Sequence, residues 1–378
     1  MSISKPQEAK KDKGIFKNNK VRFIIFCCLI AAVVVICSSI FDFSDAERSE
    51  RVMDNFYAEE DNTIDCVYFG SSATQRGWVV PEAYHEEGVA SYAMSCGTQP
   101  FVLTRYLMEE VLKTQNPEVF IIELRGIAKS PDDLWDVSVR RMLDNMKMSS
   151  TKIDAINAVT EYASKGDNGV DQTKLSYYFP LLKYHSRWNP SKQPHYGGAD
   201  QYKGYAVEPK VTFKVTEIFP LEYSERNVQP IDPATEAVLR DLLDYCDSID
   251  SRVLFIVSPY EASDAGMGKI NYAKEIVEER GYEVLNCLPE QVREEIGLNN
   301  KTCYYNREHL NFYGSEKYSV WLSRYLKKNY GVPDRRGEGK YRSWEDEYER
   351  LEKNLDGIYS DLYKNMEETI RAIEADTE

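Results

Sequence analysis

One uncharged apolar run near the N-terminus constrains this chain more than any other feature. The run covers residues 23–41, nineteen residues in all, and a helix needs ~20 residues to cross the hydrocarbon core of a membrane. The preceding residues 1–22 carry seven basic and two acidic side chains. Because basic flanks stay on the cytoplasmic side, we expect residues 1–22 to form a cytoplasmic tail and residues 23–41 a transmembrane helix. The sequence thus predicts a single-pass protein of the cell membrane, with the rest of the chain outside the cytoplasm.

A cleaved signal peptide is the alternative interpretation of the same run. The apolar region of a signal peptide usually has only ~7–15 residues and ends at a cleavage site made of small residues. Ser38-Ser39-Ile40 match such a site poorly. The sequence therefore favours an uncleaved anchor.

The composition of the remaining chain excludes several classes of protein. The net charge is −15 over 378 residues, and the N-terminal segment contributes +5, so the rest carries −20. We expect no nucleic-acid partner, because neutralising phosphates requires a cationic face. The cysteine spacing shows no zinc motif, and no two histidines have a metal-binding spacing, so we expect neither metal nor cofactor. Cys66 and Cys287 are expected to be buried as small apolar side chains.

Short apolar runs alternate with helical patterns after the anchor. The predicted strands are residues 64–70, 119–124, 252–257 and 282–286. Helical spacing of apolar residues marks residues 100–115, 234–246 and 270–280. Strands that alternate with helices predict an α/β fold, here a three-layer arrangement with a parallel sheet covered on both faces, over an extracytoplasmic domain of residues 45–335.

Two further segments stand apart from this alternation. Residues 130–230 predict an insertion that is helical at first and then rich in Tyr, Pro and Gly. We expect it to be a lid, a binding wall or ordinary loop structure. Residues 341–378 predict an acidic amphipathic helix, whose apolar stripe docks on the parent domain or pairs with a partner. Gly357 weakens helix propensity by ~1 kcal/mol and argues against a long rigid rod.

Two polar segments are candidates for chemistry. Ser71 and Ser72 follow the first predicted strand, at the edge of the sheet where ligands gather in parallel α/β folds. A serine at such a junction can also be a simple helix cap. Of the four histidines, His309 stands in a polar loop before a predicted helix at 315–329, where it could act as a general base or only as a capping residue.

Together these segments resemble the SGNH, or GDSL-type, hydrolase superfamily, and within it the membrane-anchored branch that contains D-alanyl-lipoteichoic acid assembly proteins and alginate-type O-acetyltransferases. Gly70-Ser71-Ser72 resembles the family's nucleophile motif, and Asn306-Arg307-Glu308-His309-Leu310-Asn311 resembles its closing Asp-x-x-His-Leu-Asn motif. The segment 93–99 looks like the family's loop after the second strand.

The resemblance implies a role for each of these residues. Ser72 would be the nucleophile, His309 the general base and Asn306 the residue that orients the imidazole, while Gly97 and the Ser72 amide would bind the oxyanion. Further candidates for substrate binding are Gln99, Glu123, Arg125, His185 and Arg187.

The sequence departs from the family in two places. Asn306 replaces the expected aspartate and loses its charge, so either Glu308 or another carboxylate substitutes, or the enzyme is slow. The family's Gly-x-Asn-Asp motif is absent, and the corresponding strand ends in Glu123-Leu-Arg125-Gly126, where an ordinary ion pair is expected.

The resemblance implies an extracytoplasmic serine esterase or O-acyltransferase that acts on acyl esters of cell-envelope or exported polysaccharide. Its partners would be an acylated or acyl-accepting polysaccharide and a membrane-bound acyltransferase. Several aromatic residues could supply surfaces that stack on sugars, namely Trp78, Trp135, Tyr177, Tyr178, Tyr184 and Trp188. Aromatic side chains more often belong to the core. The alternative is a degenerate fold without activity that binds glycan or partners as an assembly scaffold.

Overall fold

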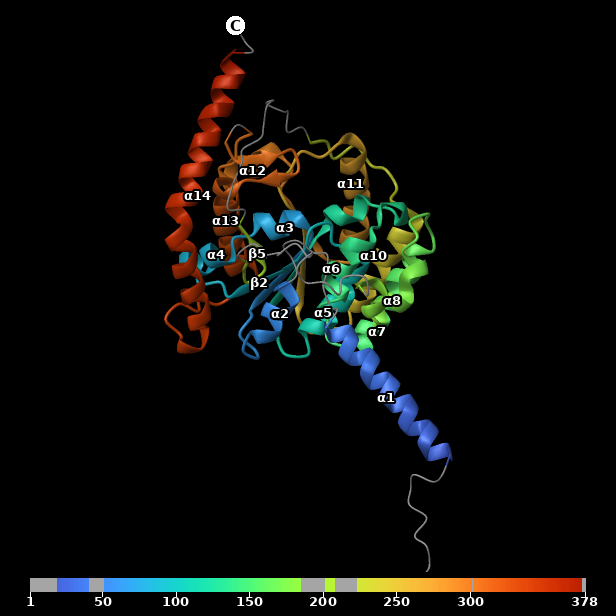
Figure 1. Cartoon of the computed structure of the whole chain (residues 1–378). Coiled ribbons are helices and arrows are strands. Elements are labelled where there is room, and N and C mark those ends of the chain that lie inside the picture. Colours follow the sequence, from blue (N-terminus) through green and yellow to red (C-terminus); the bar gives the residue numbers. More distant parts are fainter. Residues whose placement is uncertain (1–18, 41–50, 185–200, 208–222, 301, 376–378) are drawn as a thin grey trace, which may run out of the picture. The chain divides into compact units, whose positions relative to one another are not determined.

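The structure, a computed structural model, describes residues 19–40, 51–184, 201–207, 223–300 and 302–375 (Figure 1). The chain divides into two compact units. The smaller unit comprises Met1–Phe43 and Leu175–Gln193, and the larger unit comprises Ser44–Lys174 and Pro194–Glu378.

The smaller unit contains helix α1 (Asn19–Ile40). Within α1, the segment Asn19–Cys37 is long and apolar enough to cross a membrane. The predicted apolar helix is therefore present, and by length and composition it suits either a membrane anchor or a signal sequence.

The larger unit is built on a five-stranded parallel sheet. Its strands are β1 (Cys66–Gly70), β2 (Ser91–Ser95), β3 (Val119–Glu123), β6 (Arg252–Val257) and β7 (Glu283–Asn286). Their order is β2-β1-β3-β6-β7, and every pairing is parallel. The α/β prediction is confirmed at this level, and the order is compatible with a flavodoxin-like or an SGNH-type fold.

The sheet order places a ligand-binding position beside β1. Cys66 of β1 pairs with Ser91 of β2 on one side and with Val119 of β3 on the other. The chain thus passes from β1 to β2 in one direction and returns to β3 in the other. Parallel α/β sheets bind ligands at such a switch point, outside the carboxyl ends of the strands. Here that end is Gly70, directly before Ser71 and Ser72.

Helices flank this sheet. On one side α4 (Val80–Glu87) packs against α13 (Phe312–Tyr330), with α3 (Ser72–Gly77) beside them. The other side carries α5 (Thr104–Val111), α10 (Pro233–Cys246) and α11 (Asp264–Glu279) (Figure 1). The larger unit also contains α2 (Arg51–Ala58) and α12 (Glu290–Ile296).

The predicted insertion lies between β3 and β6. It contains the 3₁₀ helices η3 (Leu124–Ala128), η4 (Pro131–Asp133) and η5 (Asp171–Thr173), and the α-helices α6 (Asp136–Leu143), α7 (Ser150–Ala163), α8 (Lys174–Tyr178) and α9 (Leu181–Tyr184). A small hairpin, β4 (Gln201–Tyr202) and β5 (Tyr205–Ala206), follows. The hairpin lies against β2, because the amide of Ala93 donates to the carbonyl of Lys203.

The C-terminal helix α14 (Arg342–Ala375) is continuous for 34 residues. The predicted C-terminal helix is confirmed, and Gly357 does not interrupt it. Its stripe is buried through Trp344, Leu351, Ile358 and Leu362, and the helix packs against α4. Burial of one large apolar side chain contributes about 1.5–3 kcal/mol, which outweighs the ~1 kcal/mol cost of a helical glycine.

All eight cysteines are free. Cys66 and Cys287 are fully buried, as the apolar runs predicted.

Candidate active site

Ser72 stands at a sharp turn from strand to helix. Strand β1 ends at Gly70, Ser71 is extended, and Ser72 is the first residue of α3. A β-carbon on Gly70 would lie 2.0 Å from Thr74 Oγ1 and 2.8 Å from Cβ of Glu123. Only glycine leaves room for this turn, which presents the Ser72 hydroxyl at the carboxyl end of the sheet.

His309 approaches Ser72 from the other end of the large unit's sequence. It begins the two-residue strand β9 (His309–Leu310), which pairs with β8 (Tyr304–Asn306) just before α13. The distance from Ser72 Oγ to His309 Nε2 is 2.7 Å, a hydrogen bond between residues 237 positions apart. The structure therefore brings together the two side chains that the sequence motifs single out.

Asn306 completes the constellation through its side-chain oxygen. Asn306 Oδ1 lies 3.0 Å from His309 Nδ1, and it also accepts a hydrogen bond of 2.9 Å from the amide of Glu308. A backbone N–H can only donate, so it identifies this atom as the oxygen of the amide. His309 then carries its proton on Nδ1 and leaves the Nε2 lone pair facing Ser72. That tautomer is the one a general base requires.

The surroundings keep the His309 ring neutral. Burial, together with the positive charges of Arg125 and Arg76, lowers the pKa of His309 to about 3. Glu308, the expected substitute for the missing aspartate, presents its backbone carbonyl to Arg125 Nη1 at 2.8 Å. Among the described residues, the hydrogen-bond partner of Nδ1 is the neutral Asn306 and not a carboxylate.

Gly97 lies in the loop after β2, as the resemblance implies, although Ala93–Ser95 belong to the strand itself. The carbonyl of Gly97 accepts hydrogen bonds of 2.7 Å from Arg141 Nη1 and from Thr98 Oγ1. Thr98 is strained, with φ of 54°. Because C=O and N–H point in opposite directions in a trans peptide, the Thr98 amide faces away from Arg141.

Arg141 is a residue that sequence reasoning missed. It comes from α6 in the insertion and contacts a loop 44 positions earlier. A β-carbon on Gly97 would lie only 2.7 Å from its Nη1 atom. No local pattern around Arg141 signals this contact, because it joins α6 to the loop after β2.

Glu123 is a structural residue and not a pocket residue, contrary to its expected role in substrate binding. It is 3% exposed and accepts hydrogen bonds from the Tyr68 hydroxyl and from the amides of Ser258 and Arg125. Burial raises its pKa, opposed by the charge of Arg125. The carboxylate thus ties β1, β3 and the end of β6 together below the site.

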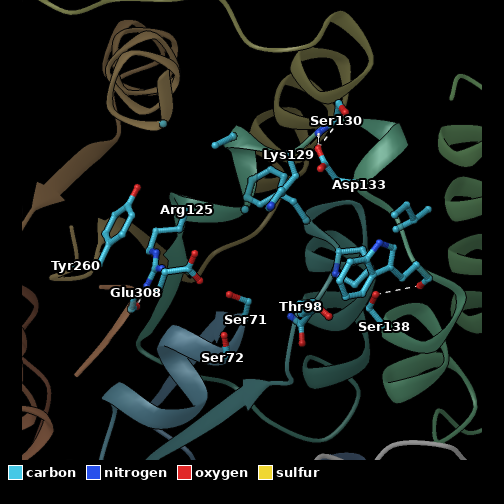
Figure 2. Close-up of a pocket in the computed structure, with 18 of the residues that line it drawn as sticks. Ser71, Ser72, Thr98, Arg125, Lys129, Ser130, Asp133, Ser138, Tyr260 and Glu308 are labelled. Carbon is cyan, nitrogen blue, oxygen red and sulfur yellow. Dashed lines mark hydrogen bonds between the residues drawn. The ribbon is translucent and has the colours of Figure 1, made fainter. Parts of the chain in front are cut away.

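Arg125 points toward the site instead of pairing side chain to side chain with Glu123. Its guanidinium carbon lies 3.8 Å from the centre of the Tyr260 ring, and its Nη1 atom donates to the Glu308 carbonyl. Figure 2 shows Arg125, Tyr260 and Glu308 grouped on one side of Ser72. The expected ion pair is therefore replaced by a backbone contact to Glu123 and a cation–π contact to Tyr260.

A pocket of about 490 Å³ opens beside Ser72 (Figure 2). Its walls come from five segments: residues 71–72, 98–101, 125–138, 260–266 and 307–308, with Tyr162 added from α7. Gln99 and Arg125, two of the candidates for substrate binding, are part of this wall. His185 and Arg187, the other two candidates, lie outside the described residues.

The aromatic candidates divide between core and pocket. Trp78 is fully buried, and its indole donates to Ser91 Oγ at 3.0 Å. Trp135 is 61% exposed and lines the pocket. In the part of the chain that the structure describes, no group of three or more His, Cys, Asp or Glu side chains could hold a metal ion.

Comparisons with known proteins do not identify a family. No protein-family model matches the sequence, and no curated protein matches it significantly.

Proposed function

We propose that this protein is a membrane-anchored, extracytoplasmic serine esterase or O-acyltransferase of the SGNH type, acting on acyl esters of cell-envelope or exported polysaccharide. The observation that carries the proposal is the chain of contacts from Ser72 Oγ to His309 Nε2 and from His309 Nδ1 to Asn306 Oδ1. A nucleophile, a base and an orienting group in this order are the geometric requirement for acyl transfer through serine.

The reaction follows from the tautomer of His309. Ser72 Oγ attacks the acyl carbonyl carbon while its proton passes to Nε2, and the resulting imidazolium protonates the leaving sugar oxygen. An acyl-enzyme remains on Ser72. Water then yields hydrolysis and a sugar hydroxyl yields transfer. The amides of Ser72 and Gly97 would stabilise the oxyanion, and one such donor contributes ~3–4 kcal/mol.

Asn306 makes this a slow variant of the mechanism. Its oxygen holds the ring in the base tautomer, but a neutral amide stabilises the developing imidazolium less than a carboxylate does. The lowered pKa of His309 also implies slow turnover, because burial and the positive charges of Arg125 and Arg76 destabilise the imidazolium.

The apolar helix supports the proposed location. An uncleaved anchor at residues 19–37, with basic residues before it, would hold the domain at the extracytoplasmic face of the cell membrane. In that position the enzyme could receive acyl groups from a membrane-bound acyltransferase and pass them to polysaccharide, or remove them.

Covalent labelling tests the proposal directly. A fluorophosphonate probe should label the wild-type protein, and mass spectrometry should locate the adduct on Ser72. Ser72→Ala should lose the label, whereas Ser164→Ala, which removes an exposed hydroxyl at the end of α7, should retain it. An adduct on Ser71, or labelling that survives in Ser72→Ala, would exclude Ser72 as the nucleophile.

A non-catalytic scaffold is the second candidate function, and the neutral Asn306 beside a ring that resists protonation favours it. A folded wild-type protein that binds glycan, takes no label and turns over no ester would support the scaffold. Measurable ester turnover that depends on Ser72 would exclude it.

A further inference from the structure

Trp135 is the feature of the pocket that the acyl-transfer chemistry leaves without a role. Its side chain is 61% exposed although it forms part of the pocket wall. The residue caps the N-terminal end of α6, and its carbonyl accepts from the amides of Ser138 and Val139. The backbone of Trp135 thus serves the helix, while the indole has no structural task that burial would indicate. Exposed large aromatic surface in a pocket marks a binding site.

We propose that Trp135 and the neighbouring wall formed by residues 129–138 bind an uncharged sugar ring of the acylated substrate, with the indole as the platform. This inference rests on the proposed function, because it names the group that carries the ester. The apolar face of a sugar ring packs against an aromatic face, while its hydroxyls need polar partners at the edge.

The same wall supplies those polar partners. Ser130 Oγ donates to Asp133 Oδ2 at 3.0 Å, and Ser138 Oγ donates to the Trp135 carbonyl at 3.0 Å. Figure 2 shows Ser130, Asp133 and Ser138 on the side of the pocket away from Tyr260 and Glu308, with Ser72 between the two groups. Hydroxyl and carboxylate groups near an aromatic face match the alternating polar and apolar surfaces of a sugar.

The charge of the pocket favours an uncharged ring over a phosphorylated or uronic one. Three cationic side chains, Arg125, Lys129 and Arg307, line it together with three carboxylates, Asp133, Glu261 and Glu308. Arg307 and Glu261 neutralise each other in an ion pair of 2.8 Å. A site for polyanions would need a surplus of cations.

The size of the pocket points in the same direction. A volume of about 490 Å³ is typical of sites that enclose a whole small molecule. An acetyl group would fill a small part of it, so the remaining space suits the group that bears the ester. A long acyl chain lying on Trp135 is the competing occupant.

Kinetics on three esters separate these occupants. The substrates are p-nitrophenyl acetate, p-nitrophenyl octanoate and O-acetylated xylo-oligosaccharides, measured on the full-length protein in detergent. For Trp135→Ala we expect the ratio of kcat/KM on the acetylated oligosaccharide to kcat/KM on p-nitrophenyl acetate to fall roughly tenfold, the effect of losing one aromatic contact. Trp135→Phe, which retains an aromatic face, should recover most of that ratio. Tyr363→Ala, which removes an aromatic side chain that is 55% exposed on α14, should leave the ratio unchanged.

A binding measurement distinguishes failure of this inference from failure of the proposed function. In Ser72→Ala, which cannot turn over, acetylated xylo-oligosaccharide should quench tryptophan fluorescence, and Trp135→Ala added to it should abolish the effect. Such binding without any turnover by the wild type would support the sugar site and reject the esterase. An unchanged oligosaccharide ratio in Trp135→Ala, or a selective loss on octanoate, would overturn the sugar site.

Discussion

Replacing Asn306 with aspartate should turn a weak catalytic base into a strong one. Asn306 Oδ1 lies 3.0 Å from His309 Nδ1 and is held by the amide of Glu308. Aspartate has nearly the same shape and can accept both hydrogen bonds. The substitution therefore adds a negative charge beside the imidazole without displacing it.

The magnitude follows from Coulomb's law. Two unit charges ~4 Å apart attract by ~4 kcal/mol at an effective dielectric constant of ~20, which corresponds to ~3 pH units. Burying the new carboxylate reduces this gain, so we expect the acid limb of the pH profile to move up by about 2 pH units. The same charge stabilises the imidazolium in the transition state, so turnover at neutral pH should rise by about tenfold or more.

The lowered pKa of His309 also determines how the activity of the wild-type protein depends on pH. A free histidine has a pKa of ~6.5, so its activity as a base falls in mildly acidic solution. The pKa of His309 is lowered to about 3, so its ring stays neutral and the rate of fluorophosphonate labelling should remain level there. Aspartate at position 306 should bring the fall in rate back toward neutral pH. NMR titration of the four histidines gives an independent reading of the ring.

Asn329→Asp provides the matched control. It adds the same charge on an exposed residue near the C-terminal end of α13, whereas His309 lies just before the first residue of that helix. Its profile should match the wild type. Identical profiles for wild type and Asn306→Asp, or a slower Asn306→Asp enzyme, would refute the assignment of Asn306 as the residue that orients the base.

Three further predictions concern the supporting structure. Arg141→Met should slow fluorophosphonate labelling by about tenfold with little change in Tm, because it releases the Gly97 carbonyl and loosens the loop that carries the proposed oxyanion donor, the Gly97 amide. Labelling at the wild-type rate would contradict this. Glu123→Gln should lower the free energy of unfolding by about 1–3 kcal/mol in urea titration. The carboxylate accepts hydrogen bonds from three donors, and an amide cannot accept all three. An unchanged urea midpoint would show that these hydrogen bonds are dispensable. Gly357→Ala should raise the free energy of unfolding by about 0.5–1 kcal/mol, because a β-carbon there meets no atom within 4 Å. Gly314→Ala should lower the free energy of unfolding, because its β-carbon would lie 2.2 Å from the Cys303 carbonyl oxygen. Equal effects of the two substitutions would contradict the packing at α13.

Several features of this protein were readable from the sequence because they depend on local patterns. The apolar run at residues 23–41 has the length and composition of α1, and the β-branched runs at 119–124 and 252–257 coincide with β3 and β6. The spacing of apolar residues also marked α10 and the buried stripe of α14. Strand β2 lacked such a signal, because Ser91–Ser95 mixes serines with apolar residues and is buried only by its neighbours.

The candidate site could be predicted only as far as its motifs extend. Ser72 and His309 were identified because each stands in a recognisable loop at the edge of a predicted sheet. The orientation of Asn306 was beyond the sequence, since it depends on the amide of Glu308 as a donor. The role of Glu123 could not be predicted from the sequence either. Its carboxylate is buried and accepts hydrogen bonds from Tyr68 and Ser258, residues of neighbouring segments.

The amino-acid sequence by itself determined the apolar helix, the α/β class and the identity of the two side chains that meet at the site, because spacing and residue type control local structure. Tertiary structure decided what lies against them: Arg141 on Gly97, a neutral oxygen on His309, and an exposed Trp135 in the pocket wall. These contacts join segments that are distant along the chain or depend on the direction of a single hydrogen bond. A local pattern of residues predicts neither.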